Sequence, residues 1–220
     1  MVTKSISLGE HYYDISPEIS SQTAVYPGDV KFKRSIHFDQ RNGDPLLLSS
    51  IESTVHVGAH TDAPNHYHPD GTGIENRDIN YYLGGCQVIS VKIPPGKRIE
   101  LKDISKISIT EMRVLFKTES FSNPNQWNAD FNSLSPELVN SLSKLGVVLI
   151  GIDTPSIDPA DSKELEAHQA IFKNNMAILE GITLTSVPDG PYNLIALPLK
   201  IKGCDASPVR AVLVKKGVLF

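Results

Sequence analysis

Residues 135–153 read Ser-Pro-Glu-Leu-Val-Asn-Ser-Leu-Ser-Lys-Leu-Gly-Val-Val-Leu-Ile-Gly-Ile-Asp and contain, in order, the signals of a helix and of a buried strand. Ser135 and Pro136 are typical of a helix start, since the hydroxyl can cap the first turn and proline fixes a helical φ. Leucines spaced three or four residues apart give this helix one apolar face, and Gly146 is expected to end it. The short β-branched run 147–152 then predicts a strand buried within an α/β sheet.

The rest of the chain alternates strands with helices in its second half and consists of strands and turns in its first half. A second helix is expected over residues 161–173, with Asp161 and Ser162 as its capping residues. Short apolar or alternating runs predict the strands, at residues 30–38, 46–57, 86–93, 113–117, 176–182, 193–201 and 209–214. No stretch is long or biased enough to be a linker, so we expect a single α/β domain over residues 1–220.

The composition excludes several classes of protein. Hydrophobic residues make up 40% and charged residues 21% of the chain, as in ordinary globular domains. The net charge of -4 leaves no basic surface for nucleic acid, and two cysteines without a Cys-x-x-Cys motif exclude a thiolate zinc site. Residues 1–10 lack the apolar core of a signal peptide, and no apolar run approaches the roughly 18 residues of a membrane span. We therefore expect a cytoplasmic protein that binds neither nucleic acid nor membrane.

A cluster of metal-binding side chains lies in the first half of the chain. His56, His60, Asp62 and His66 belong to the segment His-Val-Gly-Ala-His-Thr-Asp-Ala-Pro-Asn-His, residues 56–66. Imidazole and carboxylate groups are the ligands that zinc, manganese and similar divalent ions accept. Three ligands from one segment would leave coordination positions open for water, which is the pattern of a catalytic site.

The spacing of His56 and His60 constrains the backbone between them. In an extended chain the two residues would lie roughly 13 Å apart, too far to share an ion whose ligand bonds are about 2.0–2.2 Å long. The chain must therefore curl, and Gly58 allows this through its free φ. A helical turn would also bring the two histidines together, but the β-branched residues before them and the following Pro64 favour a strand that ends in a tight turn.

His66 follows Pro64 and Asn65, and two roles are open to it. It is either a further metal ligand or a nearby acid/base group. The alternative for the whole segment is a polar surface loop whose histidines bind nothing. Two features favour a metal site. Gly58 lies between the first two histidines, and His66 follows Pro64 as a fourth residue of a type that binds metals.

Two residues of the second half are further candidate ligands. His168 lies on the expected helix beside Ile171 and Phe172, where the alternative is a core histidine that binds no metal. Glu180 lies within the apolar strand 176–182, and a carboxylate there is costly to bury without a partner or a metal. The alternative is an edge strand with Glu180 facing water. Together with the upstream cluster, both residues become plausible ligands from the far side of one site.

Asp153 follows the apolar run 147–152 directly. The carboxyl ends of such strands are where α/β proteins place ligands. The stretch 151–158 is therefore expected to border a pocket.

Residues 56–66 match the His-x-Gly-x-His-x-Asp-x-Pro-x-His signature, and the chain resembles the metal-dependent cyclase-like hydrolases, within them the bacterial kynurenine formamidases. The likeness runs from about Asp14 to Leu213. Further segments support it, at residues 151–159, 167–169, 178–181, 194–199 and 205–213. The resemblance implies an α/β fold: a compact domain with a mixed, barrel-like β core flanked by helices, of the swivelling β/β/α type, usually in a homodimer.

The resemblance also implies a role for each candidate ligand. His56, His60 and Asp62 correspond to ligands of one zinc ion, with Asp62 bridging to a second ion. His168 would bind that second ion, and Glu180 would also bridge. The cofactor implied is Zn²⁺, two ions per subunit, with Mn²⁺ or another divalent ion as an alternative.

His66 takes the place of the family's catalytic acid/base. The family often has tryptophan before Pro-Gly-Asp, where it contacts the aromatic ring of the substrate; here Tyr26 stands at that position and can still stack. The implied reaction is hydrolysis of N-formyl-L-kynurenine to L-kynurenine and formate, a step of tryptophan degradation. The alternatives are an isatin hydrolase-like or other small aryl-amide hydrolase and, in a different class, a non-catalytic metal- or ligand-binding protein.

Overall fold

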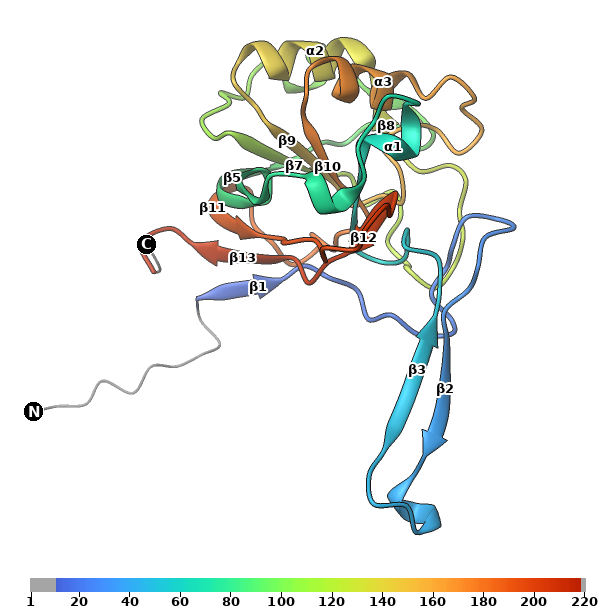
Figure 1. Cartoon of the computed structure of the whole chain (residues 1–220). Coiled ribbons are helices and arrows are strands. Elements are labelled where there is room, and N and C mark those ends of the chain that lie inside the picture. Colours follow the sequence, from blue (N-terminus) through green and yellow to red (C-terminus); the bar gives the residue numbers. More distant parts are fainter. Residues whose placement is uncertain (1–10, 219–220) are drawn as a thin grey trace, which may run out of the picture.

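The computed structural model describes residues 11–218. The expectation that residues 1–10 form no signal peptide therefore lies outside the described residues. Its centre is a mixed seven-stranded sheet with the order β1-β13-β11-β5-β7-β9-β10 (Figure 1). The last four strands run parallel, whereas the first three pair antiparallel with one another and with β5. The strands are β1 (Tyr12–Asp14), β5 (Leu83–Ser90), β7 (Arg113–Lys117), β9 (Leu149–Ile152), β10 (Ala177–Leu179), β11 (Gly190–Ile195) and β13 (Val212–Lys215).

Three two-stranded pairs and the helices complete the described part of the chain. The pairs are β2 (Lys33–Phe38) with β3 (Leu48–Glu52), β4 (His60–Asp62) with β12 (Ala206–Pro208), and β6 (Arg98–Ile99) with β8 (Ser133–Leu134). The α-helices are α1 (Pro64–Tyr67), α2 (Pro136–Lys144) and α3 (Glu166–Lys173). Short 3-10 helices are η1 (Gln40–Asn42), η2 (Ile74–Asn76), η3 (Ile79–Tyr81) and η4 (Leu101–Ile104).

Side chains that alternate along the parallel strands separate two hydrophobic cores. In β7, Val114 and Phe116 pack in the core that contains α2 and α3, whereas Leu115 belongs to the other core. This follows because successive side chains of a strand point to opposite faces. The second core also contains Leu194 of β11 and Leu213 of β13, so the sheet curls around it. The predicted mixed, barrel-like core is thus confirmed as a mixed sheet curled into a half-barrel, with few helices.

The helix predicted after Ser135 is confirmed as α2. The hydroxyl of Ser135 accepts a hydrogen bond from the N–H of Leu138 at 3.1 Å, as expected of a cap. Gly146 follows the helix with φ +87°, in the left-handed region that favours glycine. The run 147–152 then forms the fully buried strand β9 between β7 and β10. Local sequence signals therefore suffice for this αβ unit.

The prediction that Asp161 and Ser162 begin the second helix is wrong, because α3 starts later. Asp158 accepts hydrogen bonds from the N–H groups of Ala167 and His168 at 3.1 and 3.0 Å. A carboxylate from outside the helix thus satisfies the free N–H groups of its first turn. The capping role predicted for Asp161 belongs to Asp158, and this places His168 against the same carboxylate.

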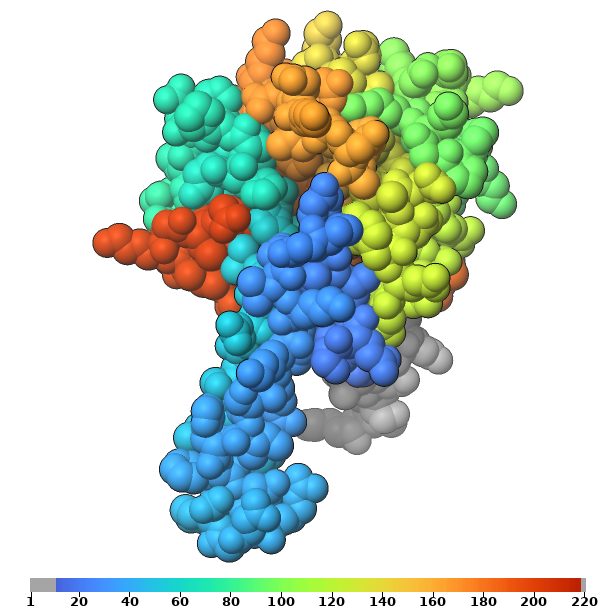
Figure 2. Space-filling model, turned by 90° about the vertical axis from the view of Figure 1, so that its right-hand side faces the viewer, coloured from blue at the N-terminus to red at the C-terminus, as the bar shows by residue number. Residues whose placement is uncertain are grey.

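β2 and β3 form a hairpin that projects from the body of the protein (Figures 1 and 2). Every residue of β3 is exposed. The strand expected over residues 46–57 already ends at Glu52. The hydroxyl of Thr54 then accepts a hydrogen bond from the N–H of His56 at 3.2 Å. This side-chain bond stabilises a turn in place of further β-sheet hydrogen bonds. The chain returns to the body from there, and Val57 is buried.

The turn predicted at Gly58 is confirmed, and it meets the other half of the chain. Gly58 has φ +61° and Gly181 has φ +64°, both in the left-handed region. A Cβ added to Gly181 would lie 2.1 Å from the carbonyl oxygen of Gly58. Beside this contact His60 and Glu180 exchange both backbone hydrogen bonds, at 3.0 and 2.9 Å. This isolated bridge therefore links β4 to the residue that follows β10, the last strand of the sheet, and joins the two halves of the chain.

Within residues 11–218, no helix is both long and apolar enough to cross a membrane.

Gly181→Ala is expected to lower the free energy of unfolding by more than about 2 kcal/mol. The left-handed backbone costs about 1–2 kcal/mol for an L side chain, and the methyl group would also overlap the Gly58 carbonyl. Urea denaturation followed by circular dichroism measures the loss. Gly203→Ala is the matched control, since its φ is +72° and no described atom lies within 4 Å of the added Cβ. If the two variants lose the same free energy of unfolding, the overlap between the added methyl group and the Gly58 carbonyl contributes nothing.

Candidate metal centre

Four of the predicted ligands are buried at one place, where β4, β10 and α3 meet. His60 and Asp62 lie on β4, His168 lies on α3, and Glu180 directly follows β10; each is 2% exposed. His56, from the loop before β4, reaches the same place. Glu180 therefore does not face water, and the histidine segment is not a surface loop. The structure brings together all five side chains predicted as ligands.

His56, His60 and Asp62 come together because the chain turns at Gly58. The ring centroids of His56 and His60 lie 5.2 Å apart, which an extended segment would not allow. Nδ1 of His56 lies 2.9 Å from Oδ1 of Asp62. Nε2 of His60 lies 3.5 Å from the same oxygen. One carboxylate oxygen thus faces both rings.

Both buried carboxylates turn their two oxygens toward different histidines. While Oδ1 of Asp62 faces His56 and His60, its Oδ2 lies 3.4 Å from Nε2 of His168. Oε2 of Glu180 lies 3.2 Å from Nε2 of His60, and Oε1 lies 3.7 Å from Nε2 of His168. Each carboxylate therefore has one oxygen beside His60 and the other beside His168.

The hydrogen bonds of two rings leave their Nε2 atoms pointing into this cluster. Nδ1 of His60 lies 2.9 Å from the carbonyl oxygen of Gly58, which can only accept, so Nδ1 carries a proton. In this tautomer the lone pair of the imidazole is on Nε2. Nδ1 of His168 lies 2.8 Å from a carboxylate oxygen of Asp158. An acceptor behind the distal nitrogen is the usual support of a metal-binding histidine.

The electrostatics of the cluster favour positive charge. Burial by itself lowers the pKa of His56 and of His168, because it disfavours the charged ring. The carboxylates outweigh it: Asp62 and Asp205 raise the pKa of His56 to about 9, and Asp158 with Asp62 raises that of His168 to about 10. Burial raises the pKa of Asp62, but the rings of His168 and His56 hold it well below its usual value. A buried site that stabilises positive charge in this way suits a divalent cation.

One buried oxygen of the cluster lacks a well-aligned hydrogen bond. Oδ1 of Asp62 accepts none from the described residues, although Nδ1 of His56 lies 2.9 Å away as an ion-pair partner. An ionised oxygen in this position is costly unless a cation or a donor meets it. The surrounding donors are imidazole nitrogens and carboxylate oxygens, which zinc, manganese and similar ions accept. The residues present thus fit a divalent ion. Two overlapping groups each have their donor atoms within 4.8 Å of one another. One group is His56, Asp62 and His66, and the other is His60, Asp62 and Glu180.

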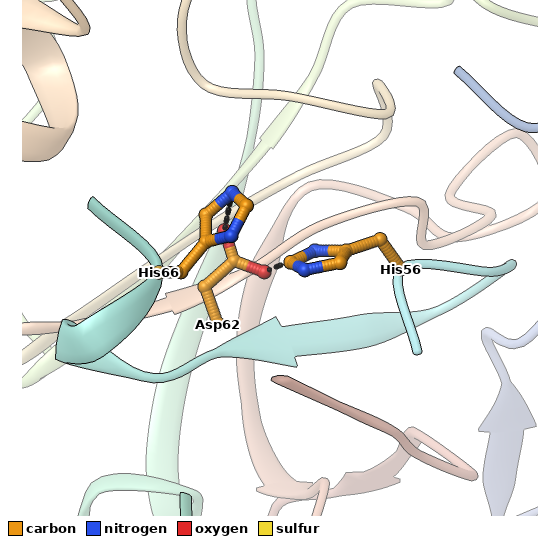
Figure 3. Close-up of side chains that lie close together, drawn as sticks. All are labelled: His56, Asp62 and His66. Atoms are coloured by element: carbon orange, nitrogen blue, oxygen red, sulfur yellow. Dashed lines mark ion pairs between the residues drawn. The ribbon is translucent and has the colours of Figure 1, made fainter. Parts of the chain in front are cut away.

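His66 lies on α1 and points toward the carboxylate of Asp62 (Figure 3), and its ring centroid lies 4.1 Å from that of His56. Its Nε2 is 4.0 Å from Oδ2 of Asp62, and its Nδ1 is 3.5 Å from Oδ2 of Asp205. Its side chain is 34% exposed, against 19% for His56, and it lines the neighbouring cavity. Burial lowers the pKa of His66, so the ring is neutral at pH 7 and can accept a proton.

The cluster lines a cavity of about 580 Å³. That volume lies within the roughly 300–1,000 Å³ of small-molecule sites. Asp153, Pro155 and Ser156 also line the cavity, which confirms that the stretch 151–158 borders a pocket. Its walls include four aromatic side chains, Tyr26, Phe121, Trp127 and Phe131.

Sequence patterns did not single out Asp158, Asp205 or Trp127. Both aspartates lie in segments that carry the family resemblance, and Asp158 also ends the stretch 151–158 that is expected to border a pocket. Trp127 is the only tryptophan of the chain, but no spacing links it to the histidines. Asp153 has a structural role, because its carboxylate accepts the N–H and the hydroxyl of Thr118 at 2.9 and 2.6 Å.

Comparison with known proteins identifies relatives along nearly the whole chain. A model of the family described as "Putative cyclase" matches residues 13–159. A kynurenine formamidase from Delftia acidovorans is 43% identical over 202 residues, which cover 91% of this chain and 96% of that protein.

Solved structures share the fold. One described as a "potential metal-dependent hydrolase with cyclase activity" is 28% identical, with a TM-score of 0.80, and the match covers 92% of this chain and 96% of that one. Another, described as a "predicted metal-dependent hydrolase" from Bacillus stearothermophilus, is 29% identical, with a TM-score of 0.77, over 92% of this chain and 97% of that one.

Asp158→Asn is expected to weaken metal binding by about 10-fold to 100-fold, because the amide orients His168 less firmly and does not raise its basicity. Competition with a chelator measures the affinity, and circular dichroism checks the fold. Asp161→Asn is the matched control, since this exposed aspartate lies in the same loop away from the ligands. An affinity unchanged from that of the control would remove Asp158 from the metal site.

Proposed function

The chain belongs to the cyclase family, and we propose that it is a kynurenine formamidase. It would hydrolyse N-formyl-L-kynurenine to L-kynurenine and formate in the cytoplasm, as a step of tryptophan degradation. The observation that carries this proposal is the identity to the formamidase of Delftia acidovorans across nearly the full length of both chains. The histidine–carboxylate cluster beside a cavity of small-molecule size supports it.

The cluster is proposed to hold two divalent ions, zinc in the first instance, with manganese or another ion as the alternative. His56 and His60 would serve one ion and His168 the other, with Asp62 and Glu180 shared between them. The support is that each carboxylate divides its oxygens between His60 and His168. When bound, the ions would supply Lewis-acid chemistry, which activates water at neutral pH and polarises a carbonyl group.

His66 is proposed to carry the proton of the reaction. The bond between the formyl carbon and the aryl nitrogen breaks while a water oxygen joins the formyl carbon, so a proton must move from that water to the leaving nitrogen. Nε2 of His66 faces the cluster and would accept and then donate this proton. Asp205 beside Nδ1 would hold the ring in place and stabilise its charged form.

His66→Ala is expected to lower kcat for formylkynurenine by about 100-fold to 10,000-fold, the usual contribution of a general acid–base group, and to leave the metal content unchanged. Initial rates and elemental analysis measure the two effects. His68→Ala is the matched control, because His68 lies in the same segment but stacks on Phe172, with ring centroids 3.7 Å apart.

Each alternative outcome has a distinct meaning. Loss of metal from the His66 variant would make His66 a ligand, as its grouping with His56 and Asp62 permits. Full activity would exclude it from the mechanism. Faster turnover of isatin than of formylkynurenine by the unaltered protein would replace the proposed substrate with a cyclic aryl amide. Bound metal without hydrolysis of any formanilide would indicate a non-catalytic metal-binding protein.

We also propose that the chain forms a homodimer through the hairpin β2–β3. Within the described part of the chain, these strands pair only with each other, and an isolated two-stranded hairpin is marginally stable in water. Exposed apolar side chains gather on it: Ile36, Phe38, Leu46, Leu47, Leu48 and Ile51. Such side chains on a projecting arm mark an interaction surface. A second copy of the chain is the proposed partner, in line with the homodimers that the family resemblance implies.

Lysine at both Ile36 and Ile51 is expected to convert the dimer into a monomer. These side chains are 50% and 71% exposed in one chain, so lysine leaves the fold intact but would place charge in the interface. Size-exclusion chromatography with light scattering measures the mass. Met112→Lys is the control, with 55% exposure outside the hairpin. A monomeric unaltered protein would contradict the dimer, and a dimeric double variant would contradict the role of the hairpin.

A further inference from the structure

The cavity beside the metal centre has an aromatic wall built around Trp127, the only tryptophan of the chain. The ring of Trp127 lies edge-on to three others. The ring centroids are 5.4 Å away for Tyr26, 6.2 Å for Phe121 and 6.1 Å for Phe131. Phe131 is buried, whereas Trp127 is only partly covered and lines the cavity.

Two loops far apart in the sequence hold Trp127 and Tyr26 together. The N–H of Ala24 donates a hydrogen bond to the carbonyl oxygen of Pro124 at 2.8 Å, so the segment before Tyr26 is tied to the segment before Trp127. Figure 2 shows the blue segment around residue 25 beside the yellow-green segment around residue 125. The aromatic pair is therefore a feature of the tertiary fold.

The hydroxyl of Tyr26 is already engaged. It donates a hydrogen bond to the carbonyl oxygen of Ala160 at 3.0 Å, from the loop that precedes α3. This bond and the contact with Trp127 fix the tyrosine ring from two sides. Tyr26 thus has less freedom to turn toward a ligand than a side chain without such a bond, and Trp127 offers the larger ring surface.

The angle between the two rings defines what fits against them. Their planes meet at 80°. A flat ring placed parallel to one of them is then nearly perpendicular to the other. Offset stacking and edge-to-face packing are the two favourable arrangements of aromatic rings, so a third ring can adopt both at once in this corner.

We propose that Trp127, together with Tyr26, binds the aromatic ring of the substrate and determines the preference for aryl amides. This inference rests on the proposed hydrolysis of an aryl formamide. The corner and the metal centre line the same cavity, so a substrate can present its ring to Trp127 and its amide to the histidine–carboxylate cluster. Trp127 is a binding residue in this arrangement and takes no part in proton transfer.

The single tryptophan allows a direct test on the metal-loaded protein, independent of turnover. Excitation selective for tryptophan reports on Trp127 alone. Titration with L-kynurenine and with formanilide is expected to change its emission saturably, whereas N-cyclohexylformamide, which has no aromatic ring, is expected to change it little. Free tryptophan titrated in parallel corrects for light absorbed by the ligands. A response that does not saturate with either aryl ligand would overturn the proposal.

Substitution tests the contact itself. Trp127→Ala is expected to weaken L-kynurenine binding by about fivefold to tenfold and to raise KM for formylkynurenine by a similar factor, with a smaller change in kcat. Trp127→Phe keeps an aromatic ring and is expected to recover most of the affinity. Calorimetry gives the dissociation constants, and urea denaturation checks that both variants fold. Tyr12→Ala is the control, since Tyr12 is an exposed aromatic residue on β1.

Failure of this proposal can be told from failure of the proposed function. If the unaltered protein hydrolyses formylkynurenine but Trp127→Ala behaves like Tyr12→Ala, the formamidase activity stands and the ring-binding role of Trp127 is wrong. If formylkynurenine is not hydrolysed but formanilide binds saturably and more weakly to Trp127→Ala, the aryl site stands and the proposed substrate is wrong.

Discussion

The two backbone hydrogen bonds between His60 and Glu180 hold the two halves of the functional site together. They attach β4 to the end of β10, so residues 120 positions apart in sequence come to share one buried cluster. The bridge forms only because Gly58 and Gly181 let the two backbones approach closely, each with a left-handed φ. Nearly every feature of the site follows, since His60 and Asp62 on one strand then face Glu180 on the other and His168 above them.

Charge is the second constraint, because the bridge buries carboxylates where water cannot solvate them. Asp62 and Glu180 are almost completely buried, and Asp158 and Asp205 stand behind the histidines. The fold offsets this charge with the rings of His56 and His168, whose pKa values rise, and it leaves Oδ1 of Asp62 without a well-aligned hydrogen bond from the described residues. The same unfavourable arrangement is what a cation would relieve, so the cost of burying these carboxylates and the proposed metal binding have one origin.

The periphery of the site is set by segments with little secondary structure. Loops around Tyr26 and Trp127 form the aromatic wall, and the loop 151–158 follows the buried strand β9. The scaffold fixes where these loops start, and their side chains decide which small molecule fits. The hairpin β2–β3 belongs to the same N-terminal half of the chain and projects outward (Figure 1). The segment that precedes the candidate ligands therefore also carries exposed apolar side chains.

The sequence by itself determined the local units: the capped helix α2, the buried strand β9, and the need for a turn between His56 and His60. Each depends on neighbouring residues only, through capping, β-branching and the free φ of Gly58. It also named the candidate ligands, although linking His168 and Glu180 to the upstream cluster depended on family resemblance. The tertiary structure alone decided that Asp158 caps α3 and supports His168, that Asp205 lies beside His56 and His66, and that Trp127 meets Tyr26. These contacts join residues separated by loops, and no periodicity encodes them, because they depend on how the sheet curls and how the loops pack over its end.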